Sequence, residues 1–242
     1  MKKYLYLLFG LMMTGCLDSD TVEPYWESYA EFNFDNESSD EVWGTEFAGY
    51  DLPKDTLMEF ISDYSDKPDT RLKMEVLNNS SDSLVGMAKV KLEKLKPNQS
   101  YEAVMNFVHM QASITEEEYN EADLRSFLGV KKNDKYVNGI FLKFGVFNQE
   151  PVIVETESRV STSLKTGEIY KATDDLVLLG RLPVNNELKD GSRQVVTFKA
   201  NAQGEAWVTL VWMSNIKDLD HSVSFDYLRV LFHELETEAS RQ

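Results

Sequence analysis

The stretch Gln194-Val195-Val196-Thr197-Phe198-Lys199-Ala200 alternates apolar and polar side chains, which is the period of a β-strand with one buried face. A turn sequence, Asn201-Ala202-Gln203-Gly204, separates it from Ala206-Trp207-Val208-Thr209-Leu210-Val211-Trp212-Met213, which is apolar on both faces. We therefore predict that the second strand is central in its sheet, or that another element covers its second face. At least one of Trp207 and Trp212 should then belong to the core.

Similar runs rich in β-branched and aromatic residues recur along the chain between turn sequences, a spacing typical of an all-β sandwich. The other predicted strands are Tyr29 to Phe34, Arg71 to Leu77, Leu84 to Leu92, Ser100 to Gln111, Gly139 to Phe147, Val152 to Glu155, Leu176 to Gly180 and Ser222 to Phe232. No internal repeat or long Pro/Gly-rich linker divides them. We predict one β-sandwich domain over residues 29–235.

One segment breaks the strand pattern. Thr115 and Glu118 have the spacing of a capping box, acidic residues fill the first turn, and Gly129 provides a stop. We predict a helix over residues 115–128, inserted between two strands.

The N-terminus has the pattern of a secretion signal. Lys2 and Lys3 precede an apolar run of about ten residues, which is too short to span a bilayer. The sequence Thr14-Gly15-Cys16 follows and contains the only cysteine of the chain. An ordinary signal peptide with an unrelated cysteine, or a poor membrane anchor, would be alternative interpretations.

Thr14-Gly15-Cys16 resembles the lipobox of bacterial lipoproteins, although Met13 stands where that family usually has leucine. The resemblance implies that residues 1–15 are removed, that Cys16 carries lipid, and that residues 16–28 form a tether to the membrane. Leu17, which follows the cysteine, implies the outer membrane by similarity to enterobacterial sorting rules.

The formal net charge of −16 disfavours nucleic acid as a partner on electrostatic grounds. His109, His221 and His233 are the only histidines and lack the paired spacing of a zinc site. Nucleophile-elbow and nucleotide-binding motifs are also missing from the sequence. We therefore predict a protein that is not an enzyme, with a glycosidase that uses two acidic residues as a third alternative.

Several short motifs keep a common order along the chain. They are Phe32-Asn33-Phe34, Asp40-Glu41-Val42-Trp43-Gly44-Thr45-Glu46-Phe47-Ala48-Gly49-Tyr50, Leu95-Lys96-Pro97-Asn98-Gln99-Ser100-Tyr101, Ala200-Asn201-Ala202-Gln203-Gly204-Glu205-Ala206-Trp207-Val208 and Val223-Ser224-Phe225-Asp226-Tyr227-Leu228-Arg229-Val230. With these motifs the chain resembles uncharacterised bacterial secreted proteins that have a galactose-binding-like, jelly-roll sandwich, the architecture of many carbohydrate-binding modules. The resemblance implies a structural calcium ion near Asp35, Glu37 and Asp226; the alternative is that these are solvated surface acids.

Aromatic residues provide the candidate binding site. Sugar rings stack on flat indole and phenol rings, and we place Trp43 and Tyr50 in an irregular segment after the first strand. The alternative for Trp43 is burial as a plug at one edge of the sandwich. We predict a lipid-anchored, non-catalytic binding module with glycan as its ligand. The alternative is an envelope assembly or accessory lipoprotein that contacts another protein through the sheet face or the inserted helix.

Overall fold

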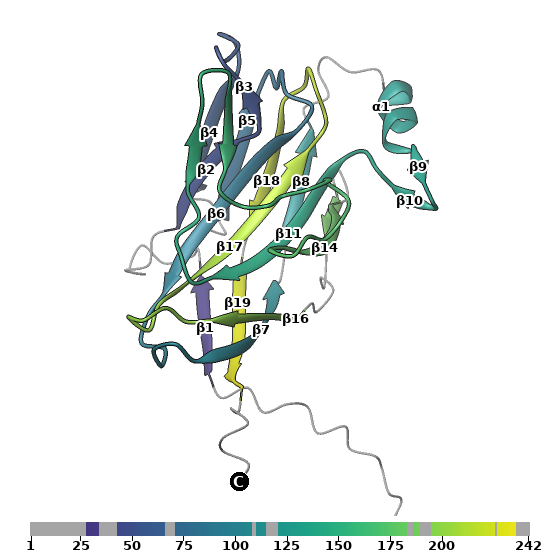
Figure 1. The fold of residues 1–242 in the computed structure, drawn as a ribbon. Coiled ribbons are helices and arrows are strands. Elements are labelled where there is room, and N and C mark those ends of the chain that lie inside the picture. Colours follow the sequence, from purple (N-terminus) through teal and green to yellow (C-terminus); the bar gives the residue numbers. More distant parts are fainter. Residues whose placement is uncertain are drawn as a thin grey trace, which may run out of the picture.

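The structure is a computed structural model and describes residues 28–33, 43–65, 71–107, 110–114, 121–182, 186–188, 195–225 and 227–235. These residues form antiparallel strands in two facing layers (Figure 1). Within them there is one helix, α1 (Glu121–Leu128). The prediction of an all-β sandwich with one short inserted helix is confirmed.

The first layer is a five-stranded sheet. Its strands, in spatial order, are β14 (Val177–Leu182), β11 (Ile140–Phe147), β17 (Ala206–Ser214), β6 (Leu84–Leu92) and β2 (Gly44–Ala48). The strand predicted to be central, β17, lies in the middle, and Trp212 is paired with Leu142 of β11 and Gly86 of β6. Both faces of β17 are covered, which explains why its sequence is apolar throughout.

The second layer contains two sheets, and at two places the chain passes directly from a strand of one sheet to a strand of the other. One sheet has the order β15 (Asn186–Leu188), β8 (Met110–Ile114), β18 (His221–Phe225), β5 (Arg71–Leu77) and β4 (Glu59–Ser65). The other has the order β1 (Ser28–Asn33), β19 (Tyr227–Glu234), β7 (Ser100–Phe107) and β16 (Val195–Lys199). Strand β8 follows β7 closely along the chain and β19 follows β18, so each predicted long strand here is divided into two.

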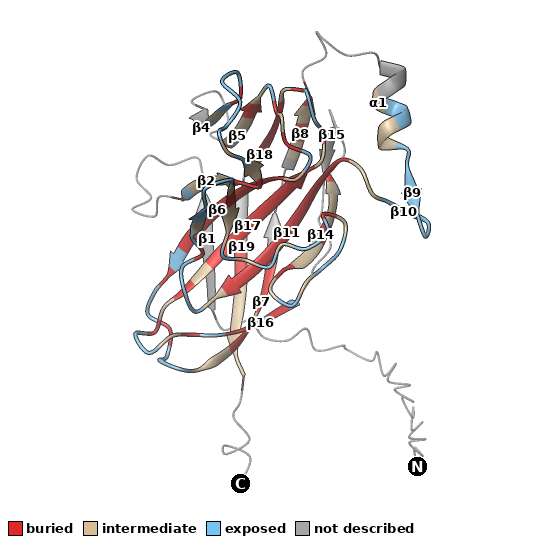
Figure 2. Cartoon of the chain, turned by 45° about the horizontal axis from the view of Figure 1, so that its top comes forward, coloured by how far each residue is buried: buried red, intermediate tan, exposed pale blue. Residues whose placement is uncertain are grey.

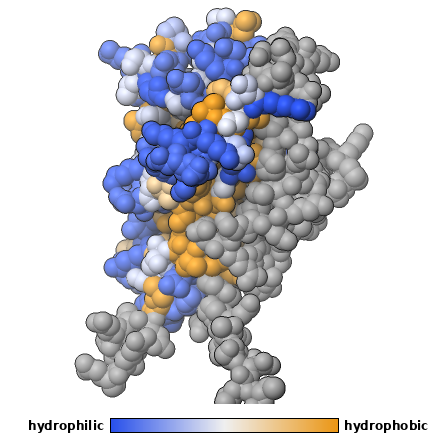
Figure 3. Space-filling view, turned by 90° about the vertical axis from the view of Figure 1, so that its right-hand side faces the viewer, coloured by the Kyte–Doolittle hydropathy of each residue, from blue (hydrophilic) through white to orange (hydrophobic). Residues whose placement is uncertain are grey.

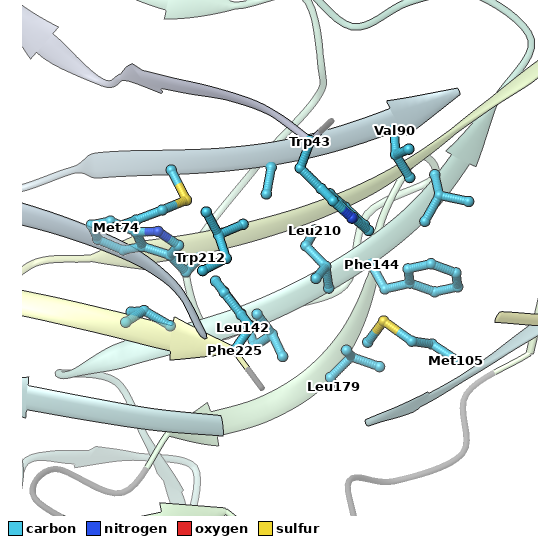
Figure 4. Packing of buried hydrophobic residues seen from close by; sticks show 14 of the residues in the cluster. Trp43, Met74, Val90, Met105, Leu142, Phe144, Leu179, Leu210, Trp212 and Phe225 are labelled. Atoms are coloured by element: carbon cyan, nitrogen blue, oxygen red, sulfur yellow. The ribbon is translucent and has the colours of Figure 1, made fainter. Parts of the chain in front are cut away.

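The main core lies between the layers. Trp212 and Leu142 from the first layer are in the same buried cluster as Met74, Phe225 and Met105 from the second (Figure 4). Figure 2 shows burial concentrated along β6, β17 and β11. Burying each large apolar side chain contributes about 1.5–3 kcal/mol, so this cluster stabilises the packing of the two layers.

A second, smaller core covers the outer face of the first layer. Phe141, Val211 and Met213 project from this face and pack against Val160 and Ile169 of the segment that connects β11 to β14. That segment crosses the front of the sheet in Figure 1 and contains β12 (Ile153–Glu155) and β13 (Arg159–Thr162). These two strands pair with each other, and β13 also pairs with β3 (Tyr50–Asp51). We call residues 148–176 the outer segment.

Helix α1 and a two-stranded hairpin, β9 (Lys131–Lys132) and β10 (Lys135–Tyr136), project from the sandwich (Figure 1). Leu124, Phe127 and Leu128 pack against the main core. The predicted helix end at Leu128 is confirmed, whereas Thr115 and the predicted first turn lie outside the described residues. No helix in the described part of the chain is long and apolar enough to cross a bilayer.

Several strands were not predicted. The segment around Trp43 and Tyr50, which we expected to be irregular, contains β2 and β3. The edge strand β4 was also missed, because its sequence Glu59-Phe60-Ile61-Ser62-Asp63-Tyr64-Ser65 has only a weak apolar alternation.

Candidate functional site

An open groove lies at the side of the sandwich where β14 and β16 are edge strands of the two layers. Its volume is about 360 Å³. The end of β11, the turn before β14, and β16 contribute the lining residues Val146, Phe147, Asn148, Asp174, Asp175, Leu176, Val177, Val195, Val196, Thr197 and Lys199. Figure 3 views this side of the molecule and shows hydrophobic residues gathered in the middle of it, with hydrophilic residues above and to the left of them.

The acidic wall of the groove belongs to a fixed turn. The backbone N–H of Thr173 donates to the carbonyl oxygen of Leu176 at 2.8 Å, and the N–H of Leu176 donates to Thr173 Oγ1 at 3.0 Å. Asp174 and Asp175 lie between them, and Asp175 Oδ2 accepts a hydrogen bond from the backbone N–H of Lys165 at 3.0 Å. The turn therefore presents two carboxylates from a backbone that is held on both sides.

Gly145 in β11 allows the aromatic wall to form. A Cβ atom at this position would lie 2.6 Å from Cζ of Phe147 and 2.7 Å from the carbonyl oxygen of Asp175. Real Cβ contacts are longer than this, so only glycine lets the Phe147 ring and the acidic turn approach together. The ring is half-buried and stays in contact with the groove.

The aromatic surface continues onto the outer face of the first layer. Trp207 is the cross-strand neighbour of Phe147, and Lys91 is the neighbour of Trp207 on the other side. Cross-strand neighbours on one face lie about 5 Å apart, so the two aromatic side chains are adjacent. Trp207 is half-buried, and Lys91 Nζ is held in ion pairs with Glu93 at 2.5 Å and Glu205 at 3.3 Å.

The groove can recognise a polyhydroxylated ligand. Asp174, Asp175 and Asn148 supply hydrogen-bond acceptors, and Asn148, Thr197 and Lys199 supply donors. Buried Val146, Leu176 and Val196 form an apolar floor. Because a sugar ring has hydroxyl groups at its rim and C–H groups on its faces, this combination of an aromatic ring, an apolar floor and polar walls matches its chemistry.

The predicted aromatic site does not lie in this groove. Trp43 is 4% exposed and belongs to the main core, so its indole faces offer no stacking surface, as the alternative interpretation of a buried plug expected. Tyr50 is half-buried at the opposite edge of the sandwich, beside β4, with its ring centroid 5.0 Å from that of Phe60. Burial raises the pKa of the Tyr50 hydroxyl, and the nearby Glu155 carboxylate raises it further. Of the two strand tryptophans, Trp212 is the core residue.

The remaining predicted site residues lie outside the described residues: Cys16, Asp35, Glu37 and Asp226. The lipidation and calcium sites therefore stay predictions. Within the part of the chain that the structure describes, no group of three or more His, Cys, Asp or Glu side chains could hold a metal ion.

Two of the buried titratable side chains, His221 and Lys143, have strongly lowered pKa values. Burial lowers the pKa of His221 to about 4, against smaller opposing effects of the Leu219 carbonyl and the Asp220 carboxylate. Lys143 projects from β11 under the outer segment and donates hydrogen bonds to the carbonyl oxygens of Thr166 and Glu168 at 2.5 and 2.8 Å. Burial lowers the pKa of Lys143 to about 8, partly offset by the charge of Glu168.

The groove could not be recognised in the sequence, because its residues stand in patterns that also occur in ordinary turns and strand ends. Asp174-Asp175 resembles any polar turn in a chain with 41 acidic residues, and Phe147 resembles the last apolar residue of a strand. Only the pairing of β11 with β14, and the approach of β16 from the other layer, bring them together. The glycine at position 145 was the one local sign of a close approach.

No protein-family model and no curated protein matches this sequence. Solved structures with a distant likeness include TmCBM61 in complex with beta-1,4-galactotriose, at 7% identity, covering 80% of this chain and 88% of that chain, with a TM-score of 0.32. The enzymatically active domain of tailspike protein 4 of bacteriophage CBA120 is 9% identical, with 84% of this chain and 20% of that chain covered and a TM-score of 0.34.

A third likeness is to the Endo-D glycoside hydrolase domain, Spr0440, of Streptococcus pneumoniae R6. It is 9% identical, the alignment covers 78% of this chain and 21% of that chain, and the TM-score is 0.28. This chain thus spans about a fifth of the length of each of these two proteins. Similarity at this level assigns neither a ligand nor an activity to this chain.

Proposed function

We propose that this protein is a lipid-anchored, non-catalytic binding protein of the bacterial cell envelope and that the groove between β14 and β16 binds a glycan. The observation that carries the proposal is the meeting of Phe147 with Asp174, Asp175, Asn148 and Thr197 around one apolar floor. An aromatic ring supplies a stacking surface, and the polar groups around it match the hydroxyl groups of a sugar.

The groove is open rather than enclosed by the fold, because it runs along the edge strands of the two layers. An open groove accommodates an internal segment of a polymer as well as a chain end. Two carboxylates on one wall favour a neutral glycan, since an acidic sugar placed against Asp174 and Asp175 would be repelled.

The test is retention of the detergent-solubilised full chain on insoluble polysaccharides, using galactan, xylan, mannan, cellulose and peptidoglycan as probes. We expect retention on at least one neutral polysaccharide. Phe147→Ala and Asp174→Ala should each weaken retention at least tenfold, since the first removes the stacking ring and the second removes a hydrogen-bond acceptor for the sugar. Glu157→Ala is the matched control, because Glu157 is exposed on the outer segment and does not line the groove.

Retention that survives both groove substitutions would overturn the assignment of the site. Absence of retention on every polysaccharide, together with co-purification of an envelope protein, would overturn glycan as the ligand. Release of new reducing ends from a retained polysaccharide would overturn the non-catalytic part of the proposal and favour the third alternative, a glycosidase.

One observation favours a protein partner as the second candidate. Strand β16 pairs with β7 on one side only among the described residues, and Val195 on it is 52% exposed. An unpaired strand edge can accept an extended segment of another protein by backbone hydrogen bonding. Replacing Thr197 with proline would remove a backbone N–H of this strand and should abolish such pairing, but it also changes the groove. Phe147→Ala and Asp174→Ala separate the two candidates, because they should weaken glycan retention and leave strand pairing intact.

The lipid anchor has its own test. In cells, Cys16→Ser should release the protein from the membrane fraction without unfolding the domain, because the acyl chains attach to this side chain alone in the proposed scheme. The domain's melting temperature, measured on the released protein, should equal that of the detergent-solubilised wild-type chain. A Cys16→Ser protein that stays acylated and membrane-bound would contradict the proposed anchor.

A further inference from the structure

Cations gather on one projecting part of this acidic molecule. Lys131 in β9 and Arg181 in β14 flank the ring of Tyr136 in β10, and Lys132 and Lys135 are the other two cations of the same hairpin. We call these five residues the basic hairpin surface. The three lysines and Tyr136 are exposed, and α1 with this hairpin stands out from the sandwich in Figure 1.

Tyr136 fixes the positions of two of the charges. Lys131 Nζ and Arg181 Cζ each lie 4.6 Å from the centroid of its ring, which is within the range of a cation–π interaction. Two cations that repel each other are therefore held beside one ring. This arrangement keeps positive charge concentrated when no anion is present.

Arg181 is also placed by the backbone. Gly139 has a φ of 132°, and a Cβ atom there would lie 2.7 Å from Arg181 Nε, so the missing side chain makes room for the guanidinium group. The Nε atom is buried and has no hydrogen-bond partner in the described structure. Burial lowers the pKa of Arg181, while the neighbouring Tyr136 opposes the change. Such a group gains more from an added anion than a fully hydrated lysine does.

The cations of this surface form no ion pairs with carboxylates of the described residues. Among the described residues no carboxylate lies within ion-pair distance of Lys131, Lys132, Lys135 or Arg181, whereas Lys89 pairs with both Glu46 and Glu150. Two acids are near. Asp134 occupies the hairpin turn, and Glu168, which pairs with Lys171 at 2.5 Å, feels the charge of Lys132. Four cations against these two acids leave the surface positive.

We propose that the basic hairpin surface binds an anionic polysaccharide, a polymer that carries carboxylate or phosphate groups along its length. The cations are spread over β9, β10 and the end of β14 instead of converging in a pocket, which suits repeated anions better than one small ion. The net charge of −16 repels polyanions at long range, but salt at physiological strength screens charges beyond about 8 Å. At shorter range the attraction between a polyanion and the basic hairpin surface therefore outweighs the repulsion from acids elsewhere in the chain.

The choice of a polysaccharide over a lipid surface rests on the proposed envelope anchor. In Figure 1, β1 begins at the lower end of the molecule, whereas α1, β9 and β10 lie toward the upper end. The hairpin therefore lies at the end of the domain away from Ser28, where the proposed tether joins the sandwich. Among the described residues of the hairpin, only Tyr136 and the neighbouring Val130 are exposed large apolar side chains, which is little apolar surface for insertion into a lipid interface.

The test compares charged polymers with their neutral counterparts. The detergent-solubilised full chain is titrated with polygalacturonate and with phosphomannan, and with carboxyl-reduced polygalacturonate and neutral mannan as controls. We expect binding to at least one charged polymer, at least tenfold weaker binding to its neutral counterpart, and a loss of affinity as salt is raised.

Two triple variants separate a specific surface from overall charge. Lys131→Gln, Lys132→Gln and Lys135→Gln combined should weaken binding at least tenfold. The matched control combines Lys94→Gln, Lys165→Gln and Lys217→Gln, three exposed lysines elsewhere in the chain that change the net charge equally. We expect the control to change binding by less than twofold. Since all six side chains are exposed, both variants should keep the wild-type melting temperature.

Equal losses in the two triple variants, or no binding to either charged polymer, would overturn the proposal. Equally strong, hairpin-dependent binding to phosphatidylglycerol vesicles or to a DNA oligonucleotide would overturn the choice of polymer. Phe147→Ala distinguishes this site from the groove, because it should leave binding to the charged polymer unchanged. Failure of the groove proposal would therefore not imply failure of this one.

Discussion

Gly86 of β6 lies directly beneath the indole of Trp212, its cross-strand neighbour in β17. A Cβ atom at position 86 would be 2.5 Å from Cζ2 of Trp212 and closer still to Cε2 and Nε1. Trp212 is 1% exposed. Its ring packs at a steep angle, in a T-shaped arrangement, against the rings of Phe47 and His221, at centroid distances of 6.1 and 5.7 Å. The indole is therefore enclosed on several sides and has no room to move away.

Gly86→Ala should lower the free energy of unfolding by about 2 kcal/mol, since overpacking a dense core typically costs 1–3 kcal/mol. Urea denaturation followed by tryptophan fluorescence measures the change. Gly44→Ala is the matched control: its Cβ would lie 3.4 Å from Cε of Lys89, a flexible side chain, so a much smaller effect is expected. If Trp212→Phe did not relieve part of the Gly86→Ala effect, the indole would not be the cause.

His221 should make the fold sensitive to mild acid. Its pKa is about 4 in the folded chain and about 6.5 in the unfolded chain. Between these values the unfolded chain binds a proton that the folded chain does not, so stability falls as the pH drops from 6.5 to 4. The full effect is about 3 kcal/mol, at 1.36 kcal/mol for each unit of pKa difference.

Urea denaturation of the wild-type chain and of His221→Phe, at pH 7 and at pH 4.5, measures this contribution. Phenylalanine keeps an aromatic ring against Trp212 but cannot titrate. We expect the wild-type chain to lose more stability than the variant between the two pH values. Parallel losses in both proteins would show that other groups, among the many carboxylates, cause the acid sensitivity.

Lys143 should act in the same direction at alkaline pH, so that stability again rises with pH. Its pKa is about 8 in the folded chain, below the ordinary value of 10.5, because the ammonium group is buried under the outer segment. Between pH 8 and 10.5 the folded chain loses this proton while the unfolded chain keeps it, so the contribution of Lys143 to stability rises with pH. Relative to Lys143→Met, the wild-type chain should gain about 2 kcal/mol between pH 7.5 and pH 10.

The comparison with methionine matters because tyrosines and other lysines also titrate in this range. Methionine has a similar length and no charge, so the difference between the two proteins isolates position 143. A difference that stays constant with pH would mean that the pKa of Lys143 is not lowered in the folded protein, as expected for a hydrated amine.

The sequence was most informative where burial alone decides the structure. The run from Ala206 to Met213 is apolar on both faces because β17 is covered by the second layer on one side and by the outer segment on the other. Its central position could therefore be predicted. Edge strands β2 and β4 were missed because the apolar pattern of each is short or interrupted.

The binding surfaces could not be predicted in the same way. Phe147, Asp174 and Thr197 come from distant parts of the chain and meet only through strand pairing and packing of the layers. Trp43 looked like a candidate for stacking because tryptophan near a turn is compatible with both exposure and burial, and the register of β2 against β6 decides between them. The net charge likewise gave no indication of the basic hairpin surface, since the chain has 41 acidic residues and is negative overall.

Gly145 links the fold to the groove, and Gly145→Ala should impair binding without removing any group that contacts the ligand. The new Cβ would displace the Phe147 ring or the backbone of Asp175, which lie 2.6 and 2.7 Å from its position. Either movement separates the aromatic wall from the acidic turn. We expect at least a tenfold loss of retention on whichever neutral polysaccharide holds the wild-type chain, with a loss of stability of about 1–3 kcal/mol. The Gly44→Ala variant, on the far edge of the same sheet, should retain binding. Wild-type retention by a folded Gly145→Ala protein would mean that the ligand does not depend on the joint position of Phe147 and Asp175.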